Sequence, residues 1–290
     1  MKILTKTDIE KTLSIDTNFM ALMDCQKKAF IDFSNGCVNV PLPLQLSFDN
    51  PMGDCHVKAG YNQLDDIFIV KIATGFYGNK ENGLPAGDGA ILVFSKSTGM
   101  LSYILCDNGF LTQVRTAIAA CIASQLSSVN HICIVGTGNL GTRTYQMMKR
   151  LYPFAKISVW NRSMGQDLSS VLESCDTVIT TTASHSALIQ THHIKSNMHI
   201  ISLGADEPGK QELQPELFCR ADHIIVDSKS QAPLFGDTAY AISDNIIQPE
   251  KLQELGAVLA QKGTFQNQLI ITDLTGIAAQ DIEMAKFVVG

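Results

Sequence analysis

The stretch HICIVGTGNLGTRTYQMMKR, residues 131–150, begins as an apolar run and continues through three glycines into a segment without a helix breaker. Gly136, Gly138 and Gly141 have the spacing G-x-G-x-x-G, which permits a tight turn, close approach of the backbone to a pyrophosphate and close packing of helix on strand. The positive end of the helix favours phosphate at the same point. The stretch therefore predicts a dinucleotide-binding turn, with a glycine turn in an ordinary βα unit as the alternative.

The end of the next apolar run bears on the choice of dinucleotide. In the pattern typical of NAD binding, an acidic residue about 20 positions beyond the glycines bonds to the ribose 2′-hydroxyl. Asn161 stands at this position, and Arg162 and Ser163 offer a cation and a hydroxyl to a 2′-phosphate. The sequence therefore predicts NADP or NAD as cofactor with NADP preferred, unless Arg162 only faces solvent. The predicted contacts in the turn are Gly136, Thr137, Gly138, Asn139, Leu140 and Gly141.

Further apolar, β-rich runs follow at intervals long enough for a helix. They lie at residues 156–160, 175–181, 198–204 and 223–228. Such alternation predicts an α/β fold with a Rossmann-type, doubly wound parallel sheet that is covered on both faces. We expect this dinucleotide-binding domain to span residues 116–263.

The first 115 residues have a different pattern. A helix is expected near residues 16–30, and the runs at 55–61, 66–74 and 89–95 indicate antiparallel strands. The tail at 274–289 has a helical period and no place in a parallel sheet, so we expect it to pack on the first domain. This gives a discontinuous α+β domain made of residues 1–115 and 264–290. The active site is expected in a cleft at the carboxyl ends of the parallel strands.

Composition excludes several classes of function. Hydrophobic residues make up 45% of the chain and charged residues 17%, and the net charge of −6 disfavours nucleic acid as a partner. No run approaches the roughly 20 apolar residues of a membrane span, and the first residues lack the apolar core of a signal peptide, so we expect a cytoplasmic protein. The eight cysteines contain no C-x-x-C pair and the seven histidines no metal spacing, which favours reduced core thiols and no metal site.

Two lysines attract attention in the first domain. Lys71 lies among apolar residues in IVKIATGFYGN, where a lysine either extends to water at a sheet edge or has a chemical role. A symmetric hairpin around residues 63–66 would place Lys58 directly opposite Lys71, and like charges in that position destabilise a sheet. An anion between them, such as a substrate carboxylate, would remove the conflict.

Arg115 and Asp206 are further candidates for chemistry. Thr112 is a plausible N-cap, which would place Arg115 in the first helical turn, where the helix dipole disfavours a cation unless an anion is bound or an acid pairs with it. Asp206 follows Gly204 at the carboxyl end of an apolar run, where catalytic groups of this fold gather. It is either a carboxylate that assists an amine or a solvated loop acid.

These residues lie in stretches that together resemble the ornithine cyclodeaminase and mu-crystallin family. The resemblance covers nearly the whole sequence, through VKIATGFYGN, GLPAGDGAILVFSKSTG, LTQVRTAIAA, GTGNLG, GADEPGKQEL and GIAAQDIEMAK. It implies a homodimer in which the outer, substrate-binding domains pair. It also implies a bound NAD or NADP and a small amino acid or cyclic imino acid as substrate.

The resemblance also implies roles for single residues. Lys71 and Arg115 would hold the substrate carboxylate, and Lys71 would also be a catalytic residue. Asp206 would act as acid and base near the reacting amine. Thr112, Thr181 and Thr182 join the glycine turn as expected cofactor contacts.

One position departs from the family pattern. Cyclodeaminases of the family usually have an arginine in a P-x-R segment before the first lysine strand, and here PLQ places Gln45 there. A neutral amide cannot replace a guanidinium as a charged clamp, so carboxylate binding is altered or Lys58 has taken over the charge.

The resemblance leaves the reaction open. An ornithine cyclodeaminase-like ammonia-lyase would convert L-ornithine to L-proline and ammonia by internal hydride transfer, and the acid in GADEPGKQEL favours this interpretation. An alanine dehydrogenase or a ketimine or pyrroline-2-carboxylate reductase would release a changed cofactor. A non-catalytic NADP-binding protein belongs to another class and is disfavoured by Lys71, Arg115 and Asp206.

Overall fold

The computed structural model describes residues 1–290, with the side chains of Tyr77 and Lys80 excepted. The chain forms two compact units, residues 1–115 with 277–290 and residues 116–276. The expected boundary after residue 263 is wrong. Residues 264–276 include the strand β16 (Ile270–Asp273), which lies inside the parallel sheet between β14 and β12. This strand is four residues long and buried on both faces, so it lacks the alternation that reveals an exposed strand.

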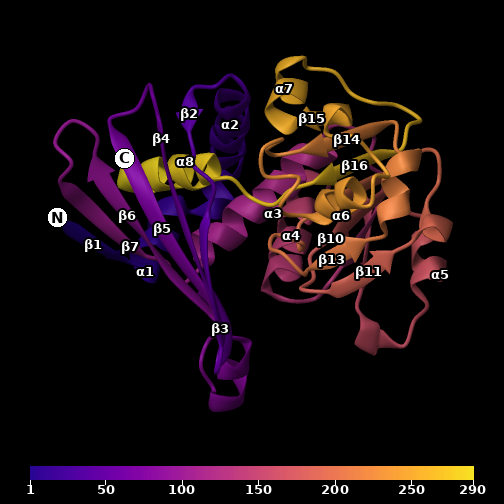
Figure 1. The fold of residues 1–290 in the computed structure, drawn as a ribbon, viewed down its shortest axis with the longest axis horizontal. Helices are drawn as coiled ribbons and strands as arrows, with labels where there is room; N and C mark the ends of the chain where they lie inside the picture. Colours follow the sequence, from indigo (N-terminus) through magenta and orange to yellow (C-terminus); the bar gives the residue numbers. More distant parts are fainter. The chain divides into compact units, whose positions relative to one another are not determined.

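The second unit contains the predicted doubly wound parallel sheet, which Figure 1 shows with helices packed around it. Its strand order is β15-β14-β16-β12-β10-β8-β9, and every neighbouring pair is parallel. The remaining strands are β8 (His131–Val135), β9 (Lys156–Trp160), β10 (Thr177–Thr180), β12 (His199–Ser202), β14 (His223–Val226) and β15 (Leu252–Glu254). A separate parallel pair consists of β11 (His185–Ile189) and β13 (Gln211–Leu213).

The α-helix α3 (Phe110–Ser124) begins in the first unit and leads into β8, and other α-helices lie in several of the connections between these parallel strands. They are α4 (Asn139–Leu151), α5 (Leu168–Leu172), α6 (Asp237–Ser243) and α7 (Leu255–Ala260). Short 3₁₀ helices are η2 (Arg162–Met164), η3 (Thr191–His193), η4 (Pro215–Arg220) and η5 (Pro249–Lys251).

The first unit is a seven-stranded sheet covered by helices on one face. Strand order is β1-β7-β6-β5-β4-β2, β3 also pairs with β4, and all pairs except the parallel β1 and β7 are antiparallel. The strands are β1 (Lys2–Thr5), β2 (Val38–Asn39), β3 (Leu44–Asp49), β4 (Met52–Asn62), β5 (Ile67–Gly75), β6 (Gly87–Ser95) and β7 (Leu101–Cys106). The helices are α1 (Lys6–Leu13), α2 (Ile15–Ser34), η1 (Tyr77–Asn82) and α8 (Ala278–Val289).

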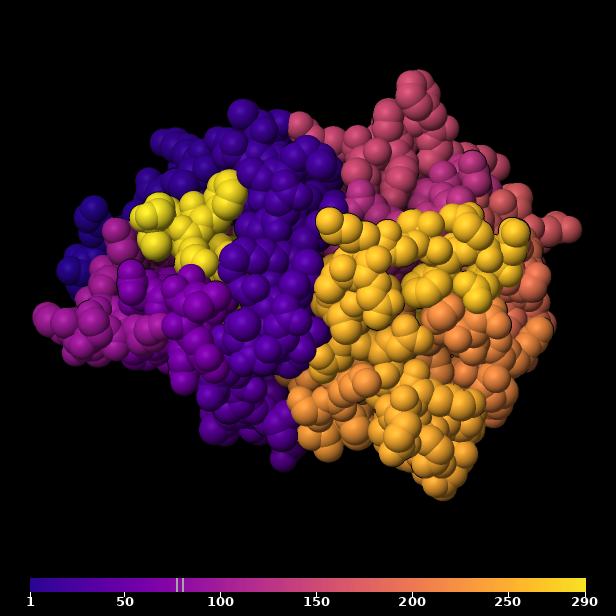
Figure 2. Space-filling view, turned by 90° about the horizontal axis from the view of Figure 1, so that it is seen from above, coloured from indigo at the N-terminus to yellow at the C-terminus, as the bar shows by residue number. Residues whose placement is uncertain are grey.

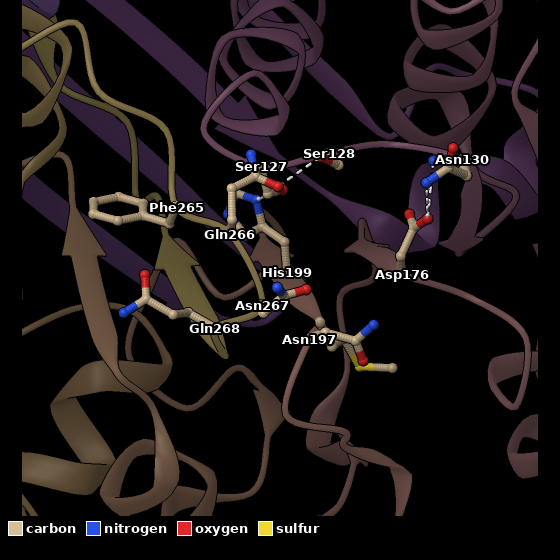
Figure 3. A pocket seen from close by; sticks show the side chains of 11 residues that line it. Ser127, Ser128, Asn130, Asp176, Asn197, His199, Phe265, Gln266, Asn267 and Gln268 are labelled. Atoms are coloured by element: carbon tan, nitrogen blue, oxygen red, sulfur yellow. Dashed lines mark hydrogen bonds between the residues drawn. The ribbon is translucent and has the colours of Figure 1, made fainter.

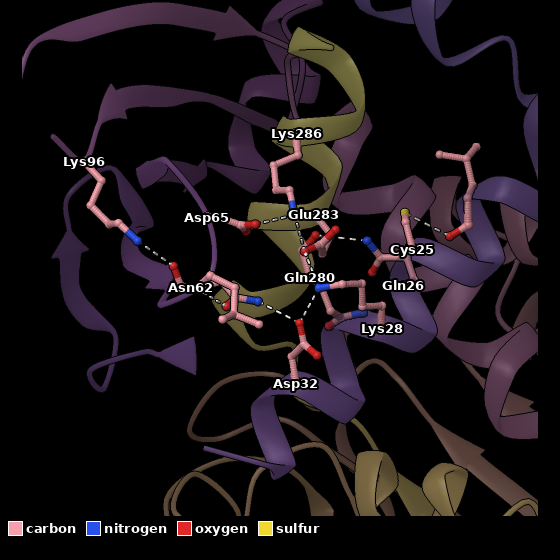
Figure 4. A network of polar contacts seen from close by, with 12 residues as sticks. Cys25, Gln26, Lys28, Asp32, Asn62, Asp65, Lys96, Gln280, Glu283 and Lys286 are labelled. Atoms are coloured by element: carbon pink, nitrogen blue, oxygen red, sulfur yellow. Dashed lines mark hydrogen bonds and ion pairs between the residues drawn. The ribbon is translucent and has the colours of Figure 1, made fainter. Parts of the chain in front are cut away.

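The C-terminal helix α8 packs on this first unit, as the sequence predicts. It contacts α2, β4 and β5, and in Figure 2 the bright yellow C-terminal end lies among the indigo and violet atoms of the unit. Figure 4 shows polar contacts that attach it. Gln26 donates to the Gln280 carbonyl at 3.0 Å, and the Lys286 ammonium lies 2.8 Å from carboxylate oxygens of both Asp65 and Glu283. The chain end is therefore held by specific partners as well as by apolar burial.

Among the described residues, no helix is long and apolar enough to cross a membrane.

The packing of α8 generates a stability prediction. Ile282 is fully buried, with Cδ1 close to the backbone of Gly60 on β4. Ile282→Ala removes three carbons from this contact and leaves a cavity, so we expect the free energy of unfolding to fall by roughly 2 to 5 kcal/mol. Urea titration followed by far-UV circular dichroism measures it. The matched control is Phe154→Ala, which removes a fully exposed ring. If Ile282→Ala lowers the free energy of unfolding no more than this control does, the packing of α8 is contradicted.

Candidate functional site

The two lysines singled out in the sequence lie directly opposite each other. Lys58 on β4 pairs with Lys71 on β5, in the register expected from the hairpin. Lys71 is buried and Lys58 is partly buried. The sequence therefore predicted the juxtaposition of two cations correctly, and the structure contains a group that relieves it.

That group is the carboxylate of Asp281 on α8. Asp281 Oδ1 lies 3.0 Å from Lys71 Nζ and 3.6 Å from Arg115 Nε, and the Asp281 side chain is only 1% exposed. The anion that the sequence argument assigned to a substrate is thus supplied in part by the protein. The sequence analysis did not single out Asp281, although an acid amid the apolar residues of GIAAQDIEMAK was a signal that could have revealed it.

Charges in this buried cluster shift one another's protonation. Burial opposes ionisation of Asp281, yet the nearby Lys71, Arg115 and Lys58 hold its pKa below the usual range. Burial, assisted by Arg115, lowers the pKa of Lys71, although Asp281 opposes that change. The next acid, Asp107, has its pKa raised by burial. By formal charge, the three cations Lys58, Lys71 and Arg115 outnumber the two acids Asp281 and Asp107, which leaves an excess of positive charge.

The cluster also contains unused hydrogen-bonding capacity. Arg115 donates from one terminal nitrogen to Gln280 Oε1 at 3.5 Å, and within the described part of the chain its Nε–H and Asp281 Oδ2 have no hydrogen-bond partner. A guanidinium carries five N–H donors. A buried cation with unfilled donors is a suitable receptor for a second carboxylate.

Arg115 reaches this cluster from a position other than the expected one. The helix α3 begins at Phe110, where the Asp107 carboxylate accepts the Leu111 N–H at 2.7 Å, so Thr112 is not the N-cap. Arg115 therefore lies in the second turn, away from the positive helix end. The physical reason is that the acidic side chain of Asp107 caps the helix earlier than the threonine would.

In the second unit, the glycine turn has the geometry that a dinucleotide requires. Gly136 has φ of +120°, which favours glycine, and a Cβ on Gly141 would lie 2.2 Å from the Gly136 carbonyl oxygen. Helix α4 starts at the N-cap Gly138 with no side-chain cap, so its first N–H groups face no side-chain acceptor. Thr181 Oγ1 bonds to the Val135 carbonyl at 3.2 Å beside the turn. These residues fit a pyrophosphate at the helix start.

Asn161 and Arg162 lie beside the turn. Asn161 Nδ2 donates to Thr137 Oγ1 at 2.8 Å, and Asn161 Oδ1 accepts from the Ser163 backbone N–H at 2.8 Å and its hydroxyl at 2.7 Å. The Arg162 guanidinium bonds to the hydroxyls of Ser184 and Ser186, both at 3.3 Å. Its partners in the described residues are neutral, so its charge is available to an anion.

Asp206 lies in the loop after β12, and its side chain is 51% exposed. Lys210 Nζ is 3.0 Å from Asp206 Oδ1 and also pairs with Glu207. The sequence analysis did not anticipate this lysine. The exposed carboxylate is open to a ligand.

Two other predicted residues have local partners. Thr182 bonds through its backbone N–H and its hydroxyl to the buried carboxylate of Glu212, a residue that the sequence analysis missed. Gln45 on β3 lies opposite His56 on β4 and is partly buried.

A polar pocket of about 180 Å³ lies at the other ends of the same parallel strands (Figure 3). Its residues precede β8, β10, β12 and β16, except that His199 is the first residue of β12. In contrast, Gly136, Thr181 and Asp206 follow β8, β10 and β12. Burial lowers the pKa of its histidine, His199, to about 3, and Ser127 and Thr272 hydroxyls bond to the two ring nitrogens. The imidazole is therefore neutral and held by hydroxyls. The described lining residues include the acid Asp176 but no lysine or arginine, so the pocket offers no cation to a carboxylate.

Comparisons with known proteins agree with this arrangement. The model of the ornithine cyclodeaminase/mu-crystallin family matches residues 2–167 and 163–290. An uncharacterized cyclodeaminase of Sinorhizobium fredii is 28% identical over 313 residues, which cover 98% of this chain and 94% of that protein.

Solved structures give the same fold. An archaeal alanine dehydrogenase dimer with bound NAD superposes with a TM-score of 0.87 at 25% identity, over 99% of this chain and 94% of that one. The iminosuccinate reductase of Paracoccus denitrificans in complex with NAD⁺ has a TM-score of 0.89 at 22% identity, over the same shares of the two chains. Because the family model spans nearly every residue, the chain belongs to the ornithine cyclodeaminase/mu-crystallin family.

Proposed function

We propose that this chain is an NAD(P)-dependent amino-acid enzyme, and that its reaction is cyclodeaminase-like: L-ornithine to L-proline and ammonia. The observation that carries the proposal is the buried cluster of Lys71, Arg115 and Asp281, which has excess formal positive charge and an unfilled N–H donor on Arg115 in a chain of this family. A carboxylate is the ligand that such a cluster binds best.

In this proposal, Lys71 and Arg115 bind the substrate carboxylate, with Lys58 adding charge from the neighbouring strand. Asp281 fixes both cations in place before the substrate arrives. Burial lowers the pKa of Lys71, and a bound carboxylate would oppose that change, as Asp281 does.

Asp206 is the proposed acid and base at the reacting amine. Its exposed carboxylate accepts a proton from the substrate ammonium or returns one, with Lys210 beside it. A nicotinamide dinucleotide held at the glycine turn would supply hydride chemistry at the substrate Cα. If the hydride returned to the product, the cofactor would be unchanged and the net reaction would be the loss of ammonia.

An NAD(P)H-dependent alanine dehydrogenase or a ketimine or pyrroline-2-carboxylate reductase is the second candidate. Gln45 departs from the cyclodeaminase pattern, because the charged clamp common to the family's cyclodeaminases is absent there. Likeness to an alanine dehydrogenase with bound NAD points the same way.

We also propose that the chain forms a homodimer through the first unit. Opposite residues of an antiparallel sheet share a face, so Leu44, Val57 and Ile72 lie together on the face turned away from Lys71 and α8. Leu44 is 55% and Ile72 38% exposed, and Leu46 and Phe48 continue the apolar row. An apolar sheet face of this kind is typical of a subunit interface.

A panel of substrates tests the proposed reaction. The protein is incubated with L-ornithine and oxidised cofactor for release of ammonia, and then with L-alanine or pyrroline-2-carboxylate while the absorbance of reduced nicotinamide is followed. Ammonia without net change in absorbance supports the cyclodeaminase. Net oxidation or reduction supports the second candidate, and cofactor binding without any turnover would contradict both.

Cofactor choice is the first prediction from this site. We expect NADP(H) to bind more tightly than NAD(H), because Asn161 does not repel a 2′-phosphate and Arg162 attracts it. Arg162→Ala should narrow the gap by about 1 to 2 kcal/mol, the loss of a charged hydrogen bond. Fluorescence titration of both reduced cofactors measures this, with Arg143→Ala as control. Tighter binding of NADH by the unmutated protein would overturn the preference.

The second prediction separates the two charged groups kinetically. Asp206→Asn keeps the size of the side chain but removes the base, so kcat should fall roughly 100-fold or more while cofactor binding is unchanged. Lys71→Ala should raise KM for the amino acid more than it changes cofactor affinity. Asp244→Asn, at an exposed acid of the same unit as Asp206, is the control. Near-normal kcat in Asp206→Asn would remove Asp206 from the reaction.

A further inference from the structure

The Glu212 carboxylate on β13 joins the ends of two parallel strands in the second unit. Its Oε1 accepts from the Thr182 backbone N–H at 2.6 Å and the Thr182 hydroxyl at 2.7 Å. Its Oε2 accepts from the Thr180 hydroxyl and the Gly204 N–H, both at 2.7 Å. Thr180 is the last residue of β10 and Thr182 follows it by two residues, and Gly204 follows the last residue of β12 by two. One buried side chain therefore connects both strand ends.

These strand ends carry residues on which the proposed function depends. Thr181 lies between the two bonded threonines, and its hydroxyl is so near the glycine turn that a Cβ on Gly136 would lie 2.5 Å from it. Asp206 follows Gly204 by two residues. Moving Glu212 would thus displace a wall of the glycine turn and the loop of the proposed acid and base.

Glu212 is itself held by a second buried acid, Asp237 on α6. Asp237 Oδ1 accepts the backbone N–H groups of Glu212 at 2.7 Å and Leu213 at 2.8 Å. Its other oxygen, Oδ2, lies 2.6 Å from the Ser202 hydroxyl, which is also 3.1 Å from Glu212 Oε2. The serine hydroxyl therefore bridges the two carboxyl groups.

The number of hydrogen atoms in this bridge determines which groups donate and which accept. The Ser202 hydroxyl has one hydrogen and can donate to only one of the two carboxyl oxygens beside it. Each oxygen of Glu212 faces a backbone N–H, which can only donate, and a threonine hydroxyl besides, so both oxygens are placed to accept. Asp237 Oδ1 accepts two N–H groups, which leaves Oδ2 as the oxygen that can carry a proton. The consistent chain runs from Asp237 Oδ2–H to Ser202 and from Ser202 to Glu212.

The pKa shifts of these buried acids agree with a proton on Asp237 and a charge on Glu212. Burial raises the pKa of Asp237 well above its usual range, and the neighbouring Asp273 and Glu212 raise it further. Burial raises the pKa of Asp273 to about 7, with Asp227 and Glu212 adding to the shift. Burial also raises the pKa of Glu212, but its hydrogen bonds from Thr182, Thr180 and Gly204 oppose that change. The acid with the most donors retains the charge.

We propose that Glu212 is the positioning residue that holds the cofactor-side ends of β10 and β12, that it acts as a carboxylate, and that Asp237 carries the proton of the pair on Oδ2. The inference rests on the proposed function, which places the cofactor and the acid and base at those strand ends. It concerns the binding of the dinucleotide, and so it can be measured without any turnover.

Two matched amide variants test the assignment. In Asp237→Asn, the amide can donate to Ser202 from Nδ2 and accept the two backbone N–H groups at Oδ1, which reproduces a protonated aspartic acid. In Glu212→Gln, either orientation of the amide sets an NH₂ group against a backbone N–H, that of Thr182 or that of Gly204. We expect dissociation constants for NADPH and NADH to rise roughly tenfold or more in Glu212→Gln, as hydrogen bonds to a charged group are lost. In Asp237→Asn they should stay within about twofold.

A third variant covers the case in which Glu212→Gln does not fold. Thr180→Val keeps the shape of the side chain and removes one donor to Glu212, so it should weaken binding of both reduced cofactors about tenfold in a folded protein. Asp244→Asn, at an exposed acid outside this network, is the control for loss of a carboxylate. Affinities that do not change in Thr180→Val, measured by fluorescence titration, would overturn the positioning role.

Infrared spectroscopy tests the location of the proton directly. At about pH 8.5, above the pKa of about 7 for Asp273, the carbonyl band of a protonated carboxyl should be present in the unmutated protein and absent in Asp237→Asn. Loss of that band in Glu212→Gln instead, or cofactor affinity that falls as far in Asp237→Asn as in Glu212→Gln, would overturn the assignment. Failure of every substrate in the activity panel with cofactor binding intact would contradict the proposed reaction and leave these readouts valid.

Discussion

The first unit depends on one ionic contact, that of the buried Asp281 carboxylate with Lys71 and Arg115. An isolated charge in a protein interior is so costly that each of these three groups requires the others. Their backbone positions lie on α8, β5 and α3, so the contact fixes the C-terminal helix against the sheet at a defined register. In the proposed function, the same contact holds the two cations that bind the substrate carboxylate.

Local sequence patterns predicted much of the fold. The bounds of β8 and β9 follow from the apolar runs HICIV and KISVW, because strands buried in a parallel sheet have continuous apolar sequences. The glycine spacing predicted the turn, since Gly136 needs a positive φ and Gly141 admits no Cβ. Counting outward from a hairpin predicted the pairing of Lys58 with Lys71, because antiparallel register follows from the turn.

Long-range partners could not be predicted in this way. Asp281 lies 210 residues from Lys71 in the chain, and no periodicity relates the two. The same is true of Glu212 and Asp237, whose hydrogen bonds connect strand ends and a helix that the sequence does not place together. The strand β16 was missed although LIIT at residues 269–272 is an apolar run of the kind that revealed β8, because the polar segment at residues 261–263 indicated the end of the domain. The start of α3 was misplaced because Asp107 caps the helix before Thr112 can.

The most direct test of the central contact is a double-mutant cycle between Lys71 and Asp281. Lys71→Met and Asp281→Asn are made singly and together, and the free energy of unfolding is measured for each by urea titration with far-UV circular dichroism. Asp281→Asn alone leaves two buried cations without their carboxylate, at a cost of about 3 kcal/mol or more. The account predicts that the double variant loses less than the sum of the single losses by roughly 1 to 3 kcal/mol. Losses that add within about 0.5 kcal/mol would contradict it.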